Sequence, residues 1–341
     1  MKRALVAVIV LALASTSVAL ATKPGSGSTT GEARVFVPNP VQDLGNQSLT
    51  DQKDADYAAL QAAYRTVRLT NLDGSGFLRG DWAVIIGETG NPAYSPTNTF
   101  LFNRSQDEFE QVMAYYWITE AQKYIQFLGF RTGGPLPPVN EEPQRLRINQ
   151  YGIDNSFATT HKDEIRLGKG GVDDAEDGEV ILHEYGHAIH FAQDFEFSSV
   201  EAGAISEGFG DYWAVTVSER VRAQLGLPAS PDPACVADWD AVSYDPTAPH
   251  CLRRLDAGLE YPDDLVGQVH ADGRIWSQAL WAVRTAIGSE RADRAILLGQ
   301  FGFDDGTMPA LATSIVEAAD QLYGGAVAAQ VEAAFASRGI L

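Results

Sequence analysis

The feature that most constrains the fold of this chain is the spacing of two histidines, His183 and His187, in a mostly apolar segment. Because they are four residues apart, a helix places both imidazoles on one face, where they can bind one metal ion. Glu184 follows the first histidine and can act on a water at that ion as a general base. The pattern therefore predicts a helix over residues 179–193 that carries part of a zinc site.

A catalytic zinc site needs a third protein ligand, and Glu207 is the candidate. It lies 20 residues after His187, which is enough chain for one helix to end, turn and return as a second helix. Asp211 is one helical turn beyond Glu207 and can accept a hydrogen bond from the far nitrogen of a liganding histidine. Small and aromatic residues surround Glu207, which favours a buried, paired carboxylate over a solvated one.

The hydrophobic pattern divides the chain into two lobes. Residues 51–178 are expected to form a strand-rich N-terminal lobe and residues 179–341 a helical C-terminal lobe, with the zinc helix at the cleft. Strands over residues 66–70 and 77–86 are expected to pair as a hairpin across a glycine-rich turn. The fold class is therefore α+β. Helices are expected over residues 107–128, 179–193, 199–225, 269–287, 309–323 and 326–338.

Residues 1–21 have the layout of a secretory signal peptide. A basic start precedes an uncharged apolar run over residues 5–20, and a small-x-small site predicts cleavage near Ala21. An uncleaved membrane anchor is the alternative, although the run is shorter than the ~20 residues of a spanning helix. Residues 22–50 are expected to be a polar tail or linker, and no other stretch is apolar enough to span a membrane. We therefore expect a secreted, extracellular protein.

Export implies an oxidising compartment, which bears on the two cysteines. Cys235 and Cys251 are expected to form a disulfide that closes a loop rich in proline and aspartate. Two free, buried thiols are the alternative.

The charge balance excludes one class of partner. The chain has 25 Lys+Arg and 45 Asp+Glu, which gives a net charge of −20. A nucleic acid needs a positive surface, so no nucleic-acid partner is expected. The same balance argues against attachment to anionic lipid through a basic segment.

The motif residues resemble those of the gluzincin zinc metallopeptidases, in particular the thermolysin-like and fungalysin-like enzymes. The matching pattern is His183-Glu184-x-x-His187, followed after 19 residues by Glu207-x-x-x-Asp211. The resemblance implies a thermolysin-like fold in which the two histidines and Glu207 ligate one zinc ion. It also implies that Glu184 is the base and that Asp211 orients a ligand. The expected activity is that of a secreted endopeptidase, a monomer, which cleaves proteins or peptides with a water that zinc activates.

Two further segments resemble the same enzymes. Residues 269–281 resemble the family's Val-His segment, in which His270 would stabilise the oxyanion of the reaction. Asn155 and Ser156 resemble the start of an edge strand that aligns a peptide substrate through its backbone. Thermolysin-like enzymes also carry an oxyanion-donating tyrosine, which has no counterpart between residues 188 and 206.

Several residues near the motif have more than one interpretation. Arg253 and Arg254 are both candidates for contact with the substrate carbonyl. The acidic cluster before the zinc helix either stabilises the helix start or binds calcium, as the family commonly does near this helix. His190 is expected at the surface. The acidic cluster consists of Asp173, Asp174, Asp177 and Glu179.

Two other functions fit the same zinc motif. A zinc aminopeptidase would need a group that captures the free amine of its substrate, and the sequence points to no such group. A non-catalytic surface or binding protein stabilised by zinc would not need Glu184 beside its ligands. That residue therefore favours catalysis over binding alone.

Overall fold

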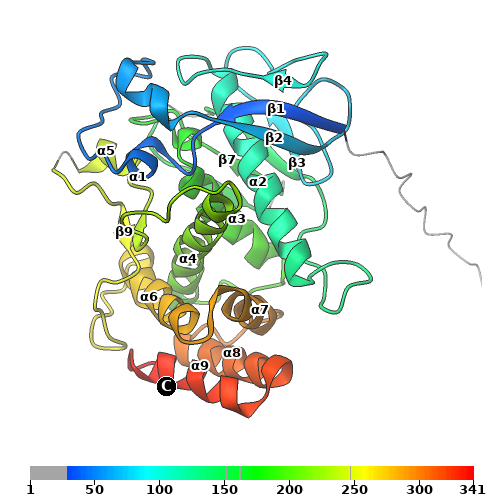
Figure 1. Cartoon of the computed structure of the whole chain (residues 1–341). Coiled ribbons are helices and arrows are strands. Elements are labelled where there is room, and N and C mark those ends of the chain that lie inside the picture. The colour runs from blue at the N-terminus through cyan, green and yellow to red at the C-terminus, as the bar shows by residue number, and fades with distance from the viewer. Residues whose placement is uncertain (1–28, 151, 161–162, 246) are drawn as a thin grey trace, which may run out of the picture.

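The computed structural model describes residues 29–150, 152–160, 163–245 and 247–341. The expected signal peptide and its cleavage site lie outside the described residues. Strands gather at one end of the molecule and helices at the other, with helix α3 (Gly178–Ala192) between them (Figure 1). The expected α+β class is confirmed. Within the described residues, no helix combines the length and the apolar character that a membrane crossing requires.

The first sheet has three strands in the order β2-β1-β4. Strand β1 (Thr29–Val35) pairs antiparallel with β2 (Arg65–Leu72) and parallel with β4 (Thr99–Phe100). The expected polar tail is therefore structured from Thr29 onward, because it supplies β1 and the short helix α1 (Pro40–Leu44).

The second sheet has four strands in the order β3-β5-β7-β6, with β6 at one edge. Strands β3, β5 and β7 run parallel, whereas β6 runs antiparallel to β7. The bounds are Ala83–Gly87 for β3, Gln144–Arg147 for β5, Phe157–Thr159 for β6 and Glu164–Arg166 for β7.

The hairpin expected from residues 66–70 and 77–86 is confirmed only next to its turn, because β2 and β3 belong to different sheets. Near the turn, the chain pairs antiparallel through one isolated bridge, between Leu72 and Gly80. Strand β2 pairs instead with β1, which comes from the segment expected as a tail. A local turn signal cannot reveal a partner that is distant in sequence.

Helix α2 (Glu108–Leu128) links the sheets to the helical part of the molecule. It contacts β1 and β3 on one side and α3 on the other. Its apolar face is buried, so it fixes how α3 sits against the sheets. The buried face includes Phe109, Val112, Met113, Tyr116, Tyr124 and Leu128.

Each predicted helix is found within two residues of its expected ends. Helix α7 is not predicted from the sequence. Only Gly288 separates it from α6, and a glycine at this place is typical of the end of a helix. The long C-terminal helices are α4 (Val200–Gln224), α6 (Val269–Ile287), α7 (Ser289–Gly299), α8 (Met308–Tyr323) and α9 (Gly325–Ala336). The short elements are η1 (Ala58–Ala63), η2 (Asp174–Glu176), β8 (Cys235–Val236), α5 (Ala241–Tyr244) and β9 (Arg253–Arg254).

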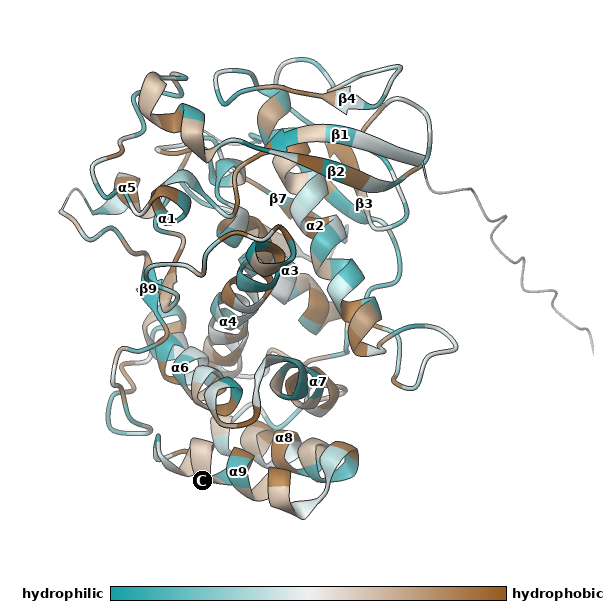
Figure 2. Ribbon diagram, viewed as in Figure 1, coloured by the Kyte–Doolittle hydropathy of each residue, from teal (hydrophilic) through white to brown (hydrophobic). Residues whose placement is uncertain are grey.

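Helix α8 is amphipathic. Hydrophobic and hydrophilic residues alternate around α8 (Figure 2). Leu311, Ile315 and Ala319 of this helix are fully buried, whereas the other side faces solvent. Helix α8 therefore packs through one apolar stripe, whereas the central helix α4 is buried on most of its sides.

The predicted disulfide is present in the loop between α4 and α6. Cys235 and Cys251 are joined, with 5.5 Å between their Cα atoms. The bond lies beside the antiparallel pair β8 and β9. Closing this loop restricts the unfolded chain, so the disulfide stabilises the segment that carries Arg253.

Glycines allow α4 to approach its two neighbours closely. A Cβ at Gly186 of α3 would lie 2.8 Å from the Gly210 Cα of α4, and one at Gly210 would lie 2.7 Å from His183 Nδ1. A Cβ at Gly208 would lie 2.3 Å from the Gly273 carbonyl oxygen of α6. Larger residues would force the helices apart, so these glycines set the spacing of α3, α4 and α6.

Candidate metal centre

Helix α3 presents two histidines because its start and its buried face are well determined. The Asp177 carboxylate caps the helix by accepting a hydrogen bond from the Glu179 backbone N–H at 2.9 Å. Fully buried apolar residues fix the rotation of the helix about its axis. His183 and His187 therefore lie on one face, with their ring centroids 4.9 Å apart. The buried apolar residues are Ile181, Leu182, Tyr185 and Ile189.

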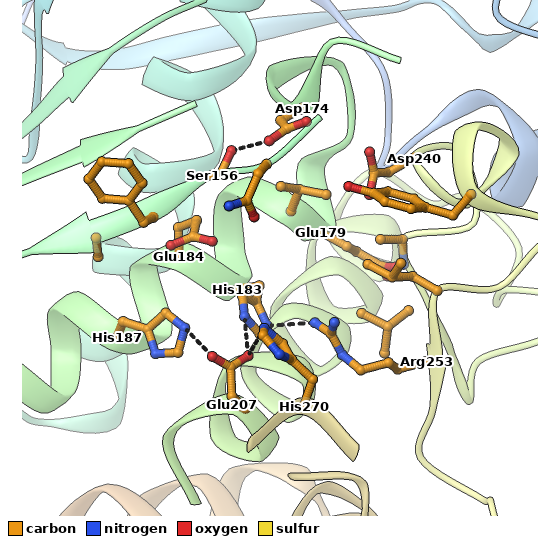
Figure 3. A pocket seen from close by; sticks show the side chains of 18 residues that line it. Ser156, Asp174, Glu179, His183, Glu184, His187, Glu207, Asp240, Arg253 and His270 are labelled. Carbon is orange, nitrogen blue, oxygen red and sulfur yellow. Dashed lines mark hydrogen bonds and ion pairs between the residues drawn. The ribbon is translucent and has the colours of Figure 1, made fainter. Parts of the chain in front are cut away.

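Helix α4 supplies a third side chain to the same place. Glu207 Oε2 lies 3.2 Å from His183 Nε2, and Glu207 Oε1 lies 3.7 Å from His187 Nε2. One candidate ligand atom from each of these residues lies within 4.8 Å of the other two. The structure thus brings the three predicted ligands together (Figure 3).

Asp211 contacts His183 as the sequence predicts. Its Oδ1 lies 2.9 Å from His183 Nδ1, so the carboxylate can accept from this nitrogen and leave Nε2 facing Glu207. Arg253 donates to both oxygens of Asp211 from Nε and Nη2, each at 2.7 Å. Although burial alone would raise it, Arg253 and His183 hold the pKa of Asp211 below its usual range. The His183 ring is therefore oriented by a carboxylate that stays ionised.

Ser206 orients the second histidine, a role that no sequence pattern predicted. Its Oγ lies 2.8 Å from His187 Nδ1, which leaves His187 Nε2 on the side of the carboxylate ligand. The same hydroxyl lies 3.0 Å from His190 Nδ1. His190 is fully buried and stacks on Phe195 and Phe209, so its expected surface position is wrong. The available signal for Ser206 was its place directly before a predicted ligand.

The centre favours positive charge between the three side chains. Burial alone would lower the pKa of His183, but its contacts with the Asp211 and Glu207 carboxylates raise that pKa to about 10. Burial lowers the pKa of His187 to about 4, so this imidazole stays neutral and keeps a lone pair. Against the effect of burial, the two histidines hold the pKa of Glu207 well below its usual range. A cation can replace the proton that His183 otherwise retains.

The donor set fits zinc. Two imidazole nitrogens and one carboxylate oxygen are the protein ligands of open catalytic zinc sites. Ligand distances of about 2.0–2.2 Å in a tetrahedron put neighbouring ligand atoms about 3.4 Å apart. The observed distances of 3.2 and 3.7 Å from the histidines to Glu207 lie on either side of this value. Glu207 Oε2 is buried and faces the Nε2 atoms of His183 and His270, yet it accepts no hydrogen bond, as expected for a ligand atom.

Glu184 has the surroundings of a general base. Its side chain is buried at the wall of the same cavity, and its Oε2 has no hydrogen-bond partner (Figure 3). Burial raises the pKa of Glu184 to about 7. A carboxylate whose pKa lies near neutrality can both accept and return a proton.

A cavity of about 410 Å³ opens over the three candidate ligands. The His270 side chain lies at its border, 52% exposed, with Nε2 at 3.4 Å from Glu207 Oε2. Asn155 and Ser156 line the cavity directly before the edge strand β6. The residues expected to meet the substrate therefore border the same space as the expected ligands.

The two candidate arginines are separated by their contacts. Arg253 lines the cavity and is paired with Asp211. Arg254 points elsewhere and pairs with Asp232 and Asp256, each at 2.7 Å. Side chains of consecutive residues on a strand leave on opposite faces, so one of the two had to face away.

Replacing Gly210 with alanine tests whether the helix spacing controls the centre. The Gly210→Ala methyl would lie 2.7 Å from His183 Nδ1, so His183 or α4 must move. We expect zinc affinity to fall by roughly 10–100-fold, as when the partner of a ligand is lost. Competition with a chromophoric chelator measures the affinity. Gly325→Ala is the control, because its nearest atom would be at 3.7 Å, and equal affinity in both variants would contradict the role of Gly210.

The comparisons with known proteins support the fold. No family model matches the chain, and no curated protein matches it. Among solved structures, 21 chains match. One is described as the precursor of protealysin, a metalloproteinase from Serratia proteamaculans, with 16% sequence identity and a TM-score of 0.52. The match covers 68% of this chain and 79% of that one. At this identity the similarity shows the fold alone, and it agrees with the fold expected from the sequence.

Proposed function

We propose that this chain is a secreted zinc endopeptidase that hydrolyses peptide bonds in proteins or peptides. The observation that carries the proposal is the placement of the buried Glu184 carboxylate beside three side chains that fit zinc, at the wall of one open cavity. A site that only stores or senses a metal needs the three ligands but has no use for a base beside them.

The chain's own residues divide the chemistry among them. His183, His187 and Glu207 would hold the zinc ion. When bound, zinc would supply a Lewis acid that polarises a peptide carbonyl and makes a water more acidic. Glu184 takes the proton of the attacking water at Oε2 and passes it to the leaving nitrogen. Asp211 keeps His183 in the orientation and tautomer that this arrangement needs.

His270 is the candidate donor for the oxyanion. Negative charge develops on the carbonyl oxygen in the transition state, and a donor at that oxygen lowers the barrier. The His270 ring borders the cavity on the side of Glu207. Arg253 lines the same cavity and contributes a fixed positive charge.

The edge strand β6 is the candidate binding site for the substrate backbone. It is the last strand of its sheet, and the residues before it, Asn155 and Ser156, line the cavity. An extended peptide can add to such an edge through main-chain hydrogen bonds. This mode does not require a chain end, so it supports endopeptidase over aminopeptidase activity.

Glu184→Gln tests the proposed base. The amide keeps the size of the side chain but cannot carry the proton, so peptide turnover should fall by about 10²–10⁴-fold. Zinc content and thermal stability should stay close to those of the parent, because the ligands are unchanged. Turnover on an internally quenched peptide, with mapping of the cleaved bond, is the measurement.

Glu196→Gln serves as the control for Glu184→Gln, because Glu196 is an exposed carboxylate just beyond α3. Its turnover should equal that of the parent. A Glu184→Gln protein that cleaves peptide at the parent rate would rule out the mechanism. Release of amino-terminal residues alone would instead favour an aminopeptidase.

His270→Ala tests the oxyanion donor. We expect kcat and kcat/KM to fall together by about 10²-fold, because the interaction forms in the transition state. The half-exposed ring puts the loss at the lower end of the range for such donors. His270→Gln should recover part of the loss by restoring an N–H donor. Turnover that is unchanged in His270→Ala would remove this residue from the site while leaving the zinc assignment intact.

A further inference from the structure

The cavity above the candidate zinc centre has an acidic end. Asp174 and Asp240 line it at the end away from Glu207 (Figure 3). Asp154 joins them, and one carboxylate oxygen from each of the three residues lies within 4.8 Å of the other two. The three aspartates come from the loop before β6, from η2 and from the residue before α5. Segments that are far apart in sequence therefore concentrate negative charge at one end of the space above the ligands.

These three carboxylates are buried without the partners that such burial requires. Asp174 is 3% exposed and Asp240 is 4% exposed. The Oδ1 atom of each aspartate is buried and has no hydrogen-bond partner, although Ser156 Oγ donates to the other oxygen of Asp174. Burial raises the pKa of each of the three carboxyl groups, and the charge of neighbouring acids raises it further. Buried carboxylates in this condition are costly unless a cation compensates them.

The neighbouring basic side chains are already paired with other acids. Among the described residues that line the cavity, Arg253 is the one arginine or lysine, and it donates to both oxygens of Asp211. Lys169 Nζ lies 3.0 Å from Asp107 Oδ1 and 3.5 Å from Asp173 Oδ2. Neither side chain is free to compensate the three aspartates, whereas the open cavity gives a ligand access to this end.

The other acids near the start of α3 already have donors. Asp177 caps the helix. Glu179 lines the cavity and accepts hydrogen bonds from side-chain and backbone donors. Outside the zinc centre, Asp174 and Asp240 are therefore the described acids of the cavity that each keep a buried oxygen without a donor.

Apolar side chains line the same cavity. They are Val180, Val236 and Leu252. Val180 lies four residues before Glu184 on α3, so the two share a face of the helix about one turn apart. The element that begins with Asp174 precedes this helix. A substrate side chain that starts beside Glu184 and runs along Val180 therefore meets apolar surface first and carboxylates at its end. Lysine and arginine have this form, an apolar stem with a charged head.

We propose that Asp154, Asp174 and Asp240 form a subsite for the cationic side chain, lysine or arginine, of a residue beside the cleaved bond. The inference rests on the proposed function and specifies the class of substrate for the same site. A neutral side chain would leave the carboxylates uncompensated and an acidic one would be repelled, so the subsite discriminates against both. The free amine at the start of a peptide carries the same charge, and the test separates it from a side chain.

The test uses the full, zinc-loaded chain and internally quenched peptides with acetylated amino termini. The peptides differ at one residue, which is lysine, arginine, norleucine or glutamate. Norleucine keeps the unbranched apolar stem and lacks the charge. We expect kcat/KM for the lysine and arginine peptides to exceed that for norleucine by at least about tenfold, because hydrogen bonds to a charged group discriminate strongly. Mass spectrometry of the products should place the cut directly beside the cationic residue.

Substitutions assign the preference to the acidic end. Asp240→Asn and Asp154→Asn should each lower the ratio of kcat/KM between the lysine and norleucine peptides by about tenfold, because each removes one negative charge. Asp245→Asn is the control, since Asp245 is exposed and lies just beyond α5, and its ratio should equal that of the parent. Zinc content and melting temperature show that each variant is folded. Equal ratios in Asp240→Asn, Asp154→Asn and Asp245→Asn would overturn the proposal.

Binding to the Glu184→Gln protein separates this inference from the proposed function. Fluorescence anisotropy of labelled lysine and norleucine peptides measures their affinities without turnover. Tighter binding of the lysine peptide, with no cleavage of any peptide by the parent, would support the subsite and contradict the proposed function. Equal cleavage and equal binding of the two peptides would overturn the subsite and support the peptidase. Cleavage of peptides with a free amino terminus alone would assign the carboxylates to a terminal amine and likewise overturn the proposal.

Discussion

The close contact between α3 and α4 is the constraint on which the candidate site depends. Gly186 and Gly210 remove the side chains that would keep the two helices apart. At this spacing Glu207 and Asp211, one turn apart on α4, reach the two nitrogens of the same imidazole. A wider spacing would leave His183 without one partner or the other. The helix crossing therefore sets both the position of the ligands and the orientation of the ring.

Charge compensation explains how so many ionisable groups can be buried together. Arg253 neutralises Asp211, and Asp211 in turn supports His183. Arg253 does not belong to α3 or α4. It lies on β9, directly after the disulfide that joins Cys235 to Cys251. A zinc ion would complete the network between His183, His187 and Glu207.

The sequence predicted the parts of the site that a single helix or a short spacing determines. The i, i+4 rule placed His183 and His187 on one face, and the same rule placed Asp211 with Glu207. The helices were found close to their expected ends because their apolar patterns are long. The fold class followed from the same division between strands and helices.

The remaining features depend on tertiary contacts that no local pattern encodes. The hairpin forms only next to its turn, because β2 takes its main partner from a segment with little hydrophobic periodicity. His190 is buried because two phenylalanines from separate segments enclose it. Ser206 and the choice between Arg253 and Arg254 required the geometry of α4 against the disulfide loop. The convergence of Asp154, Asp174 and Asp240 likewise joins positions that the sequence keeps far apart.

Anomalous diffraction from crystals of the chain grown with zinc, recorded on both sides of the zinc absorption edge, tests the metal assignment most directly. The structure predicts one zinc peak about 2.0–2.2 Å from His183 Nε2, His187 Nε2 and an oxygen of Glu207. A zinc-edge peak bound by other side chains, or no peak at these three, would contradict the assignment of the site.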